Sequence, residues 1–284
     1  MVAKARRLLG RRKVGHAGTL DPDATGLLIL GIGRATRLLR YVSRLDKSYA
    51  GEAVLGAATT TLDASGEVIA TWDMDGVTLD QVQAAARRLT GTIRQVPPMV
   101  SAKQVEGHRL YELARHGVDV AREAVEVRVT RFQVAEPGGR GQPGGERVFT
   151  VAVRCSSGTY VRSLVADLGT MLGGGAHLRN LRRCSIGRFG VEEAIPIDEL
   201  TSERLLPPLA VFRDERPVMV DDDLVAAVGH GQVLPVEVVA AHATRPRGPW
   251  PLVDGAGNLL AVYVAHRPGT IKPDVVLVGG DSGG

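Results

Sequence analysis

An aspartate in a loop rich in turn-forming residues is the strongest candidate for chemistry in this sequence of 284 residues. Asp21 lies in the segment GHAGTLDPDATG at residues 15–26, and Pro22 follows it directly. Because a proline restricts the residue before it to extended conformations, Asp21 should occupy a fixed loop position outside any helix. A carboxylate presented in this way can act as a covalent nucleophile. An isolated Asp-Pro pair is more often a turn or a cap, so the wider sequence must decide.

A second candidate, Arg162, lies near the start of an expected helix. Val161, Leu164, Val165 and Leu168 share one face at helical spacing, which places Arg162 in the first turn and off this apolar stripe. Arginine is usually unfavourable near a helix N-terminus, where the helix dipole is positive. The position of Arg162 departs from this rule, which indicates a functional role, although a solvated arginine is the simpler alternative.

The elements that must position these residues are mixed strands and helices. We expect a buried strand at 27–32, a basic helix at 34–44, a strand that Tyr49 opens, a helix from Thr78 to Leu89, and a hairpin with strands at 125–129 and 149–155. Because strands and helices do not alternate regularly, the pattern predicts an α+β domain over residues 1–205. A linker at 206–216 and a small β-rich domain at 217–284 should follow.

Composition favours a folded protein of a reducing compartment. Hydrophobic residues make up 44% of the chain and charged residues 23%, as in ordinary globular domains. Cys155 and Cys184 lie far apart without a CxxC pair, which predicts neither a disulfide framework nor a metal site. We find neither a membrane-spanning apolar run nor the apolar core of a signal peptide, and therefore expect a cytoplasmic protein.

Positive charge is concentrated in two regions. Residues 1–47 hold eleven Lys or Arg against three acidic residues, although the net charge is only +4. A second cluster consists of Arg179, Arg182, Arg183 and Arg188. Clustered Lys and Arg are typical of nucleic-acid binding, but solvated basic faces are equally common, so charge alone does not decide.

Five blocks of the sequence, in order, resemble the pseudouridine synthases of the TruB type. They are GHAGTLDPDATG at 15–26, DKSY at 46–49, VPPMVSAKQVEGHRLYELARHG at 96–117, CSSGTYVRSLVADLG at 155–169 and GAHLRNLRR at 175–183. The resemblance implies an isomerase that converts the T-loop uridine at tRNA position 55 into pseudouridine, without a cofactor or metal. It also implies a catalytic domain with a mixed and antiparallel sheet, followed by a PUA-like domain that contacts the acceptor end of tRNA.

The resemblance assigns roles to three residues in catalysis. Asp21 is implied to be the nucleophile, which can attack either the ribose or the pyrimidine ring. Arg162 would pair with Asp21 and hold it ionised and oriented. Tyr49 would stack on the uracil once the base leaves its stack.

Further positions are implied to bind the substrate. His16 would contact the RNA, Tyr160 and Leu181 would line the uracil pocket, and Thr19 and Leu20 would shape the loop around Asp21. Arg179, Arg182 and Arg183 would bind phosphates of a single-stranded RNA loop, whose splayed bases a protein can read. The simpler alternatives are that His16 is merely exposed to solvent and that Tyr160 and Leu181 pack in the core.

One departure from the family pattern concerns the N-terminus. Family members usually begin with a strand and a K-P-x-G-x-T-S type segment, whereas this sequence opens on the helix that follows them. We therefore expect a sheet edge without its usual partner strand.

Three other functions remain open at this point. The chain could bind RNA without modifying it, or it could be a glycoside-type hydrolase that uses Asp21 and Asp23 as paired carboxylates. It could also resemble the RNA-guided relatives that act within multiprotein particles. Its length and the absence of a long basic tail favour a stand-alone enzyme, which we expect to be a monomer.

Overall fold

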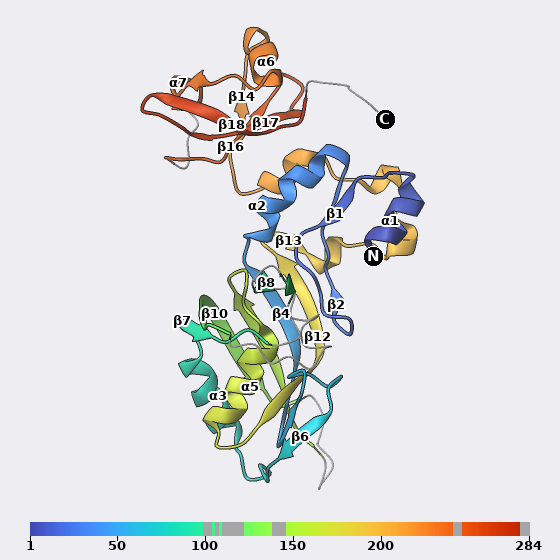
Figure 1. Cartoon of the computed structure of the whole chain (residues 1–284), viewed down its shortest axis with the longest axis vertical. Coiled ribbons are helices and arrows are strands. Elements are labelled where there is room, and N and C mark those ends of the chain that lie inside the picture. Colours follow the sequence, from blue (N-terminus) through green and yellow to red (C-terminus); the bar gives the residue numbers. More distant parts are fainter. Residues whose placement is uncertain (99–103, 106–107, 110–121, 138–145, 241–245, 279–284) are drawn as a thin grey trace. The chain divides into compact units, whose positions relative to one another are not determined.

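The computed structural model describes residues 1–98, 104–105, 108–109, 122–137, 146–240 and 246–278, and the chain forms two compact units (Figure 1). One unit, here called the sheet unit, combines residues 18–28 and 44–194. The other, here called the terminal unit, combines residues 1–17, 29–43 and 195–284. The units interleave along the chain, and the expected domain boundary at residue 205 stays a prediction.

A seven-stranded sheet forms the centre of the sheet unit. Its order is β13-β12-β4-β11-β10-β7, and β2 pairs with β12 outside this path. The strands are β2 (Thr25–Gly26), β4 (Lys47–Leu55), β7 (Gly91–Gln95), β10 (Val125–Ala135), β11 (Arg147–Cys155), β12 (Ala176–Ile186) and β13 (Phe189–Gly190). All pairs are antiparallel except β2 with β12. The predicted hairpin is confirmed as β10–β11, whereas the strand expected to open at Tyr49 begins two residues earlier.

Two helices, α3 (Leu79–Arg88) and α5 (Val161–Met171), pack on this sheet. Their apolar faces join inward-facing residues of β10 and β11 in one buried core. Helix α3 begins at Thr78 with a capping box, in which Thr78 accepts from the Gln81 backbone and Gln81 accepts from the Thr78 backbone. Both helices confirm the spacing read from the sequence.

Short hairpins and turns complete the sheet unit. They are β5 (Ala57–Thr59) with β6 (Val68–Thr71), β8 (Gln104–Val105) with β9 (His108–Arg109), and the 3-10 turn η2 (Val191–Glu193). Most of the sequence block at 96–117 lies outside the described residues.

The N-terminal part of the terminal unit is less regular than expected. Its elements are α1 (Val2–Leu9), β1 (Val14–His16), β3 (Leu30–Ile32), η1 (Gly33–Leu38) and α2 (Leu39–Ser43), with β1 paired to β3. The basic helix starts as a 3-10 turn, in which the Thr36 hydroxyl donates to the Gly33 carbonyl and so competes with an α-helical hydrogen bond. The buried strand is limited to 30–32, because the Leu27 backbone N–H donates instead to the Arg183 carbonyl.

A five-stranded sheet at the C-terminus confirms the predicted β-rich region. Its order is β14-β16-β17-β18-β15. The elements are β14 (Val218–Met219), α6 (Asp222–Gly229), β15 (Leu234–Pro235), α7 (Glu237–Ala240), β16 (Trp250–Val253), β17 (Leu259–Ala265) and β18 (Thr270–Val276), preceded by the 3-10 turns η3 (Ile197–Glu199), η4 (Ser202–Arg204) and η5 (Pro208–Phe212). The segment expected to be a linker thus contains η5, whose Phe212 is buried and meets the Tyr41 ring edge-on at 5.1 Å. None of the helices in the described ranges has the length and apolar character needed to span a bilayer.

Candidate active site

The loop that carries Asp21 is attached to the edge of the central sheet. Thr25 and Gly26 pair with Arg182 and Arg183 of β12 in parallel. Within the loop, the Ala24 backbone N–H donates to the Asp21 carbonyl at 3.0 Å, which closes a turn around Pro22. The Asp21 side chain retains 39% of its exposure. Asp21 therefore lies outside any helix, as its Asp-Pro sequence predicts, with its carboxylate accessible.

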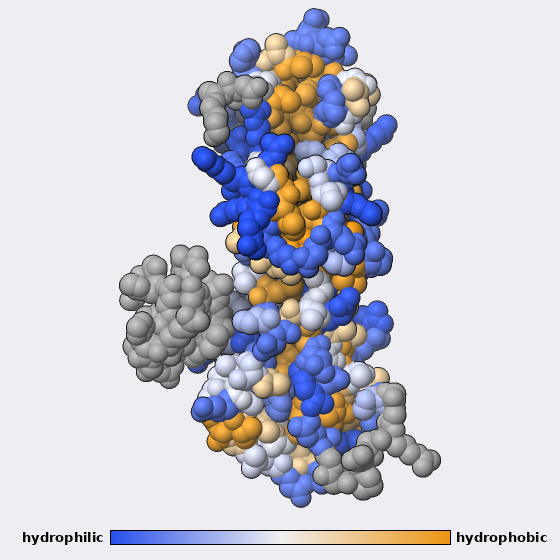
Figure 2. All heavy atoms as spheres, turned by 90° about the vertical axis from the view of Figure 1, so that its right-hand side faces the viewer, coloured by the Kyte–Doolittle hydropathy of each residue, from blue (hydrophilic) through white to orange (hydrophobic). Residues whose placement is uncertain are grey.

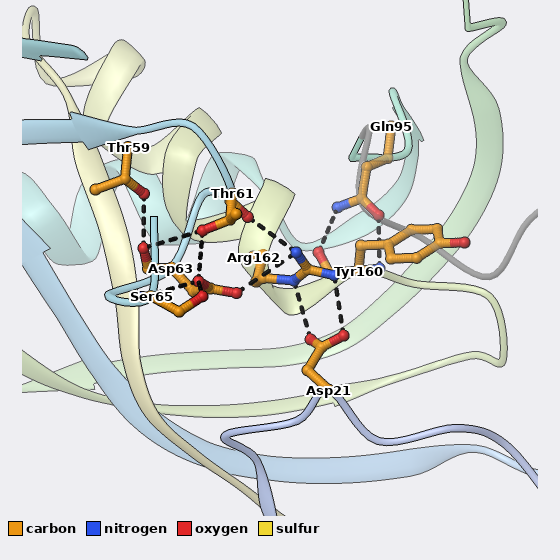
Figure 3. A network of polar contacts seen from close by, with 8 residues as sticks. All are labelled: Asp21, Thr59, Thr61, Asp63, Ser65, Gln95, Tyr160 and Arg162. Atoms are coloured by element: carbon orange, nitrogen blue, oxygen red, sulfur yellow. Dashed lines mark hydrogen bonds and ion pairs between the residues drawn. The ribbon is translucent and has the colours of Figure 1, made fainter. Parts of the chain in front are cut away.

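Arg162 forms a two-point ion pair with this carboxylate. Its Nε lies 2.9 Å from Asp21 Oδ2, and its Nη2 donates to Asp21 Oδ1 at 3.0 Å (Figure 3). The arginine is in the first turn of α5 and only 4% exposed. Two parallel charge-assisted contacts fix the orientation of a carboxylate as well as its position. The structure thus brings together two residues that lie 141 positions apart.

A buried glutamine fixes the start of α5 and with it the position of Arg162. Gln95 of β7 is fully buried, and its amide accepts from the Tyr160 backbone N–H at 2.8 Å and donates to the Tyr160 carbonyl at 3.0 Å. The Ser163 hydroxyl adds a bond to the Val96 carbonyl at 3.0 Å. Tyr160 is therefore held by its backbone, while its ring points away from Asp21 (Figure 3).

A second carboxylate, Asp63, was not found by sequence reasoning. Arg162 Nη1 donates to the Thr61 carbonyl at 2.9 Å and lies 3.5 Å from Asp63 Oδ2. Asp63 Oδ1 accepts from the Thr61 hydroxyl at 2.6 Å and from the Ser65 hydroxyl at 2.5 Å (Figure 3). The sequence TTTLDASG does indicate a turn, but nothing in it links this turn to Arg162.

The charges around Asp21 act in opposite directions on its pKa. Burial raises the pKa of Asp21 above its ordinary value and is the largest effect. Arg162 lowers this pKa, as expected, while the neighbouring charge of Asp63 raises it again. The net result is a carboxylate that is more basic than one in water and is held in a fixed orientation.

A hollow of about 190 Å³ opens beside this pair of residues. Its lining consists of Asp21, Asp23, Ala24, Asp63, Ala64, Ser65, Arg162, Leu178, Arg179, Asn180 and Leu181. The β12 strand bulges between Arg179 and Arg182, and Asn180 has a φ of 55° there. Bulges next to sites re-aim side chains, which accounts for Leu181 facing the hollow.

Tyr49 lies near this site but is absent from the described lining of the hollow. It occupies β4, opposite Arg183 of β12, and packs against the core of the sheet unit. Burial raises the pKa of the Tyr49 hydroxyl, while the Arg183 guanidinium lowers it and the Asp21 charge raises it further. The structure thus places Tyr49 beside Arg183 and within electrostatic reach of Asp21.

The three arginines of β12 have different surroundings. Arg179 is paired with Glu52 at 2.8 Å and with Glu146 at 2.5 Å, whereas Arg182 is exposed. Arg183 is 1% exposed. Of the three arginines of β12, Arg182 is therefore the most open to solvent, and Arg188, the fourth member of the basic cluster, is also exposed.

The remaining predicted residues lie around the start of the loop. Thr19 is exposed and Leu20 is half-buried. His16 is exposed at the end of β1, which belongs to the terminal unit. In the part of the chain that the structure describes, we find no group of three or more His, Cys, Asp or Glu that could hold a metal ion.

The sequence matches two family models that together cover residues 6–206. One is the TruB family pseudouridylate synthase N-terminal domain, over residues 6–161. The other is the tRNA pseudouridylate synthase B C-terminal domain, over residues 162–206. The chain belongs to the TruB family of pseudouridylate synthases. The predicted enzyme class, an isomerase, is thereby confirmed.

Individual TruB relatives match most of the chain. The tRNA pseudouridine synthase B of Thermobifida fusca (strain YX) is 43% identical over 98% of this chain and 94% of its own length. That of Mycobacterium sp. (strain KMS) is 49% identical over 76% of this chain and 70% of its own length. The family resemblance of the five sequence blocks is confirmed.

Solved structures agree with the expected α+β fold. A chain of the H/ACA RNP bound to a substrate RNA containing 2′-deoxyuridine has a TM-score of 0.67 and 23% identity, over 98% of this chain and 79% of that one. A chain of the Cbf5-Nop10-Gar1 complex has a TM-score of 0.69 and 24% identity, over 96% of this chain and 78% of that one. At such identities the likeness concerns the fold alone.

Proposed function

We propose that this TruB-family enzyme is a tRNA pseudouridine synthase that isomerises the T-loop uridine at position 55, with Asp21 as its nucleophile. The observation that carries the proposal is the two-point ion pair between Asp21 and Arg162 at the wall of a hollow. The names of the relatives, tRNA pseudouridine synthase B, support tRNA as the substrate.

The reaction is an isomerisation that balances without a co-reactant. The C1′–N1 bond of uridine breaks and a C1′–C5 bond forms. The hydrogen at C5 leaves as a proton, and N1 of the base gains a proton. The Asp21 carboxylate adds to one carbon, of the ribose or of the pyrimidine ring, and is released unchanged. Since no electrons are gained or lost overall, we propose that the enzyme needs no cofactor.

The residues around Asp21 have distinct roles in this proposal. Arg162 keeps the carboxylate oriented toward the hollow. Leu181 lines the hollow that receives the base, and Tyr49 supplies an aromatic face from strand β4. Everting a base costs a few kcal/mol, which stacking and phosphate contacts offset. Exposed basic residues such as Arg182 are suited to those phosphates.

We further propose how the rest of the chain takes part. His16 and Thr19 are exposed and available to the RNA, while Leu20 shapes the loop. The C-terminal sheet is proposed to contact the acceptor end of the tRNA. We propose a cytoplasmic enzyme that acts as a monomer.

Incubation with an unmodified tRNA transcript tests the proposal, with pseudouridine mapped along the product. We expect modification at the T-loop position and a loss of roughly 10⁴-fold or more in rate for Asp21→Asn. Asp80→Asn is the matched control, because it removes an exposed carboxylate from α3. Modification by Asp21→Asn at the wild-type rate would contradict the mechanism. Release of free uracil would favour the hydrolase, and binding without modification would favour a non-catalytic RNA binder.

A further inference from the structure

The loop that carries Asp21 needs an anchor outside itself. Residues 18–28 contain only the two-residue strand β2, and both ends of this segment continue into the terminal unit. Displacements of about 1 Å can reduce the rate of an enzyme by about 100-fold. A nucleophile on such a loop therefore requires contacts that hold the loop to the sheet.

Arg183 provides contacts at both ends of this segment. Its Nε donates to the Leu27 carbonyl at 2.7 Å, and its Nη2 donates to the Gly18 carbonyl at 3.2 Å. Its own backbone carbonyl accepts from the Leu27 N–H at 2.9 Å. One side chain thus joins the start and the end of the loop, with Asp21 between them.

We propose that Arg183 is a positioning residue that clamps the Asp21 loop, and that it does not bind a tRNA phosphate. The inference rests on the proposed function, because it concerns the placement of the proposed nucleophile. An arginine that is 1% exposed and donates to two backbone carbonyls has little surface left for a phosphate. Arg183 therefore differs in role from Arg182, its exposed neighbour in the same basic cluster.

The backbone around the clamp has a matching requirement for glycine. Gly26 has a φ of 100°, and a Cβ there would collide with the backbone of Arg183. Only glycine allows this conformation and this close approach without strain. Two features therefore fit the loop to β12: the hydrogen bonds of the Arg183 side chain, and the lack of a side chain at Gly26.

The shape of the arginine side chain suits the clamp better than that of lysine. A planar guanidinium donates in two fixed directions at once, whereas an ammonium is a compact charge on a flexible stem. A lysine, Lys47, is already buried beside this site, and its pKa is lowered by burial and by the charge of Arg183. Placing two cations close together is unfavourable, which indicates that the guanidinium is kept for a specific task.

The clamp also reaches the proposed stacking residue. Arg183 lies opposite Tyr49 across β4 and β12, and its charge lowers the pKa of the Tyr49 hydroxyl against the effect of burial. Arg183 is therefore placed to set the positions of Asp21 and Tyr49 together.

A comparison of Arg183→Lys with Arg182→Gln tests the clamp. For Arg183→Lys we expect a single-turnover rate at saturating tRNA that falls by about 10- to 100-fold. Its Kd for tRNA, and the slope of log Kd against log salt, should stay close to those of the wild type. Arg182→Gln should instead weaken binding and reduce the salt slope by about 1, as the loss of a phosphate contact does. An Arg183→Lys protein with the wild-type rate, or with the binding defect of Arg182→Gln, would overturn the proposal.

Two further measurements keep the test decisive. Gly26→Ala disturbs the same junction and leaves Arg183 in place, so it should also slow turnover at unchanged Kd. Full activity of Gly26→Ala would contradict the claim that the fit between the loop and β12 controls turnover. Hydrogen exchange needs no activity: amides of 18–28 should exchange faster in Arg183→Lys, with α3 unaffected. Unchanged exchange would refute the clamp even if the wild type forms no pseudouridine, whereas faster exchange in an inactive wild type would refute only the proposed function.

Discussion

Arg162 lies between two carboxylates, and this arrangement makes the pKa of Asp21 sensitive to Asp63. The negative charge of Asp63 raises the pKa of Asp21, so Asp63→Asn should lower that pKa. If ionised Asp21 is the active form, its activity should then persist to lower pH, and the acid limb of the pH profile should move down. The maximum rate should fall roughly tenfold, because Arg162 loses one of its two charged partners.

Single-turnover rates at saturating tRNA, measured across pH for Asp63→Asn and the wild type, check this expectation. Asp80→Asn, at an exposed position of α3, serves as the control and should leave the profile unchanged. An acid limb that moved to higher pH would show that Asp63 acts mainly by strengthening the hold of Arg162 on Asp21.

The ionised carboxylate of Asp21 should reduce the stability of the fold at neutral pH. Burial raises the pKa of Asp21 in the folded state above its unfolded value, so the folded state binds this proton more tightly. The stability associated with the protonated form is then present at low pH and is lost as pH rises through the raised pKa. Asp21→Asn mimics the protonated form and should have a Tm at or above that of the wild type at pH 7. Thermal unfolding between pH 4 and pH 8 should show this difference shrinking toward low pH; a lower Tm for the variant at pH 7 would contradict it.

At the scale of elements, the start of α5 depends on one buried amide. Gln95→Leu would leave the Tyr160 N–H without its partner, which costs about 1–3 kcal/mol, while the Tyr160 carbonyl would keep only its bond from the Leu164 N–H. The same change frees the first turn that carries Arg162, so both Tm and the single-turnover rate should fall. Thr78→Ala is a matched control, because loss of its cap costs about 1 kcal/mol at α3 and does not touch α5. If the two variants slowed the reaction equally, stability alone would explain the loss.

The sequence predicts those elements whose signals are local. The Thr78 cap and the apolar spacing of α5 lie within a few residues of the helices that they define, and both were predicted correctly. The bulge in β12 depends on its register with β4, which no local pattern records. For the same reason the sequence does not distinguish the buried Arg183 from the exposed Arg182, and Asp63 was missed because only the folded chain brings it to Arg162.

At the scale of the whole molecule, the N-terminal basic cluster divides into two sets. Arg34, Arg37 and Arg40 donate to carbonyls at the end of the C-terminal sheet, at 2.8, 2.7 and 2.5 Å. All three are exposed, but their guanidinium groups are occupied by these carbonyls. Arg7, Arg11, Arg12 and Lys13, in α1 and the segment after it, are exposed too and are not held by such carbonyl contacts within the described residues. Figure 2 shows strongly hydrophilic side chains gathered at the level of α1 on the face that it presents. The second set therefore has more free hydrogen-bond donors to offer a phosphate backbone than the first.

This division predicts different salt dependences of tRNA binding. Each phosphate contact that is lost should reduce the slope of log K against log salt by about 1. The double variant Arg11→Gln with Arg12→Gln should therefore reduce the slope by about 2 and weaken binding at low salt. The matched double variant Arg34→Gln with Arg37→Gln removes the same charge but breaks bonds to the carbonyls of Leu277 and Val276, so it should lower Tm and leave the slope nearly unchanged. Titrations at several salt concentrations, with thermal unfolding of both variants, separate the two sets. Equal slopes for the two variants would mean that long-range charge, and not access to phosphates, governs the binding.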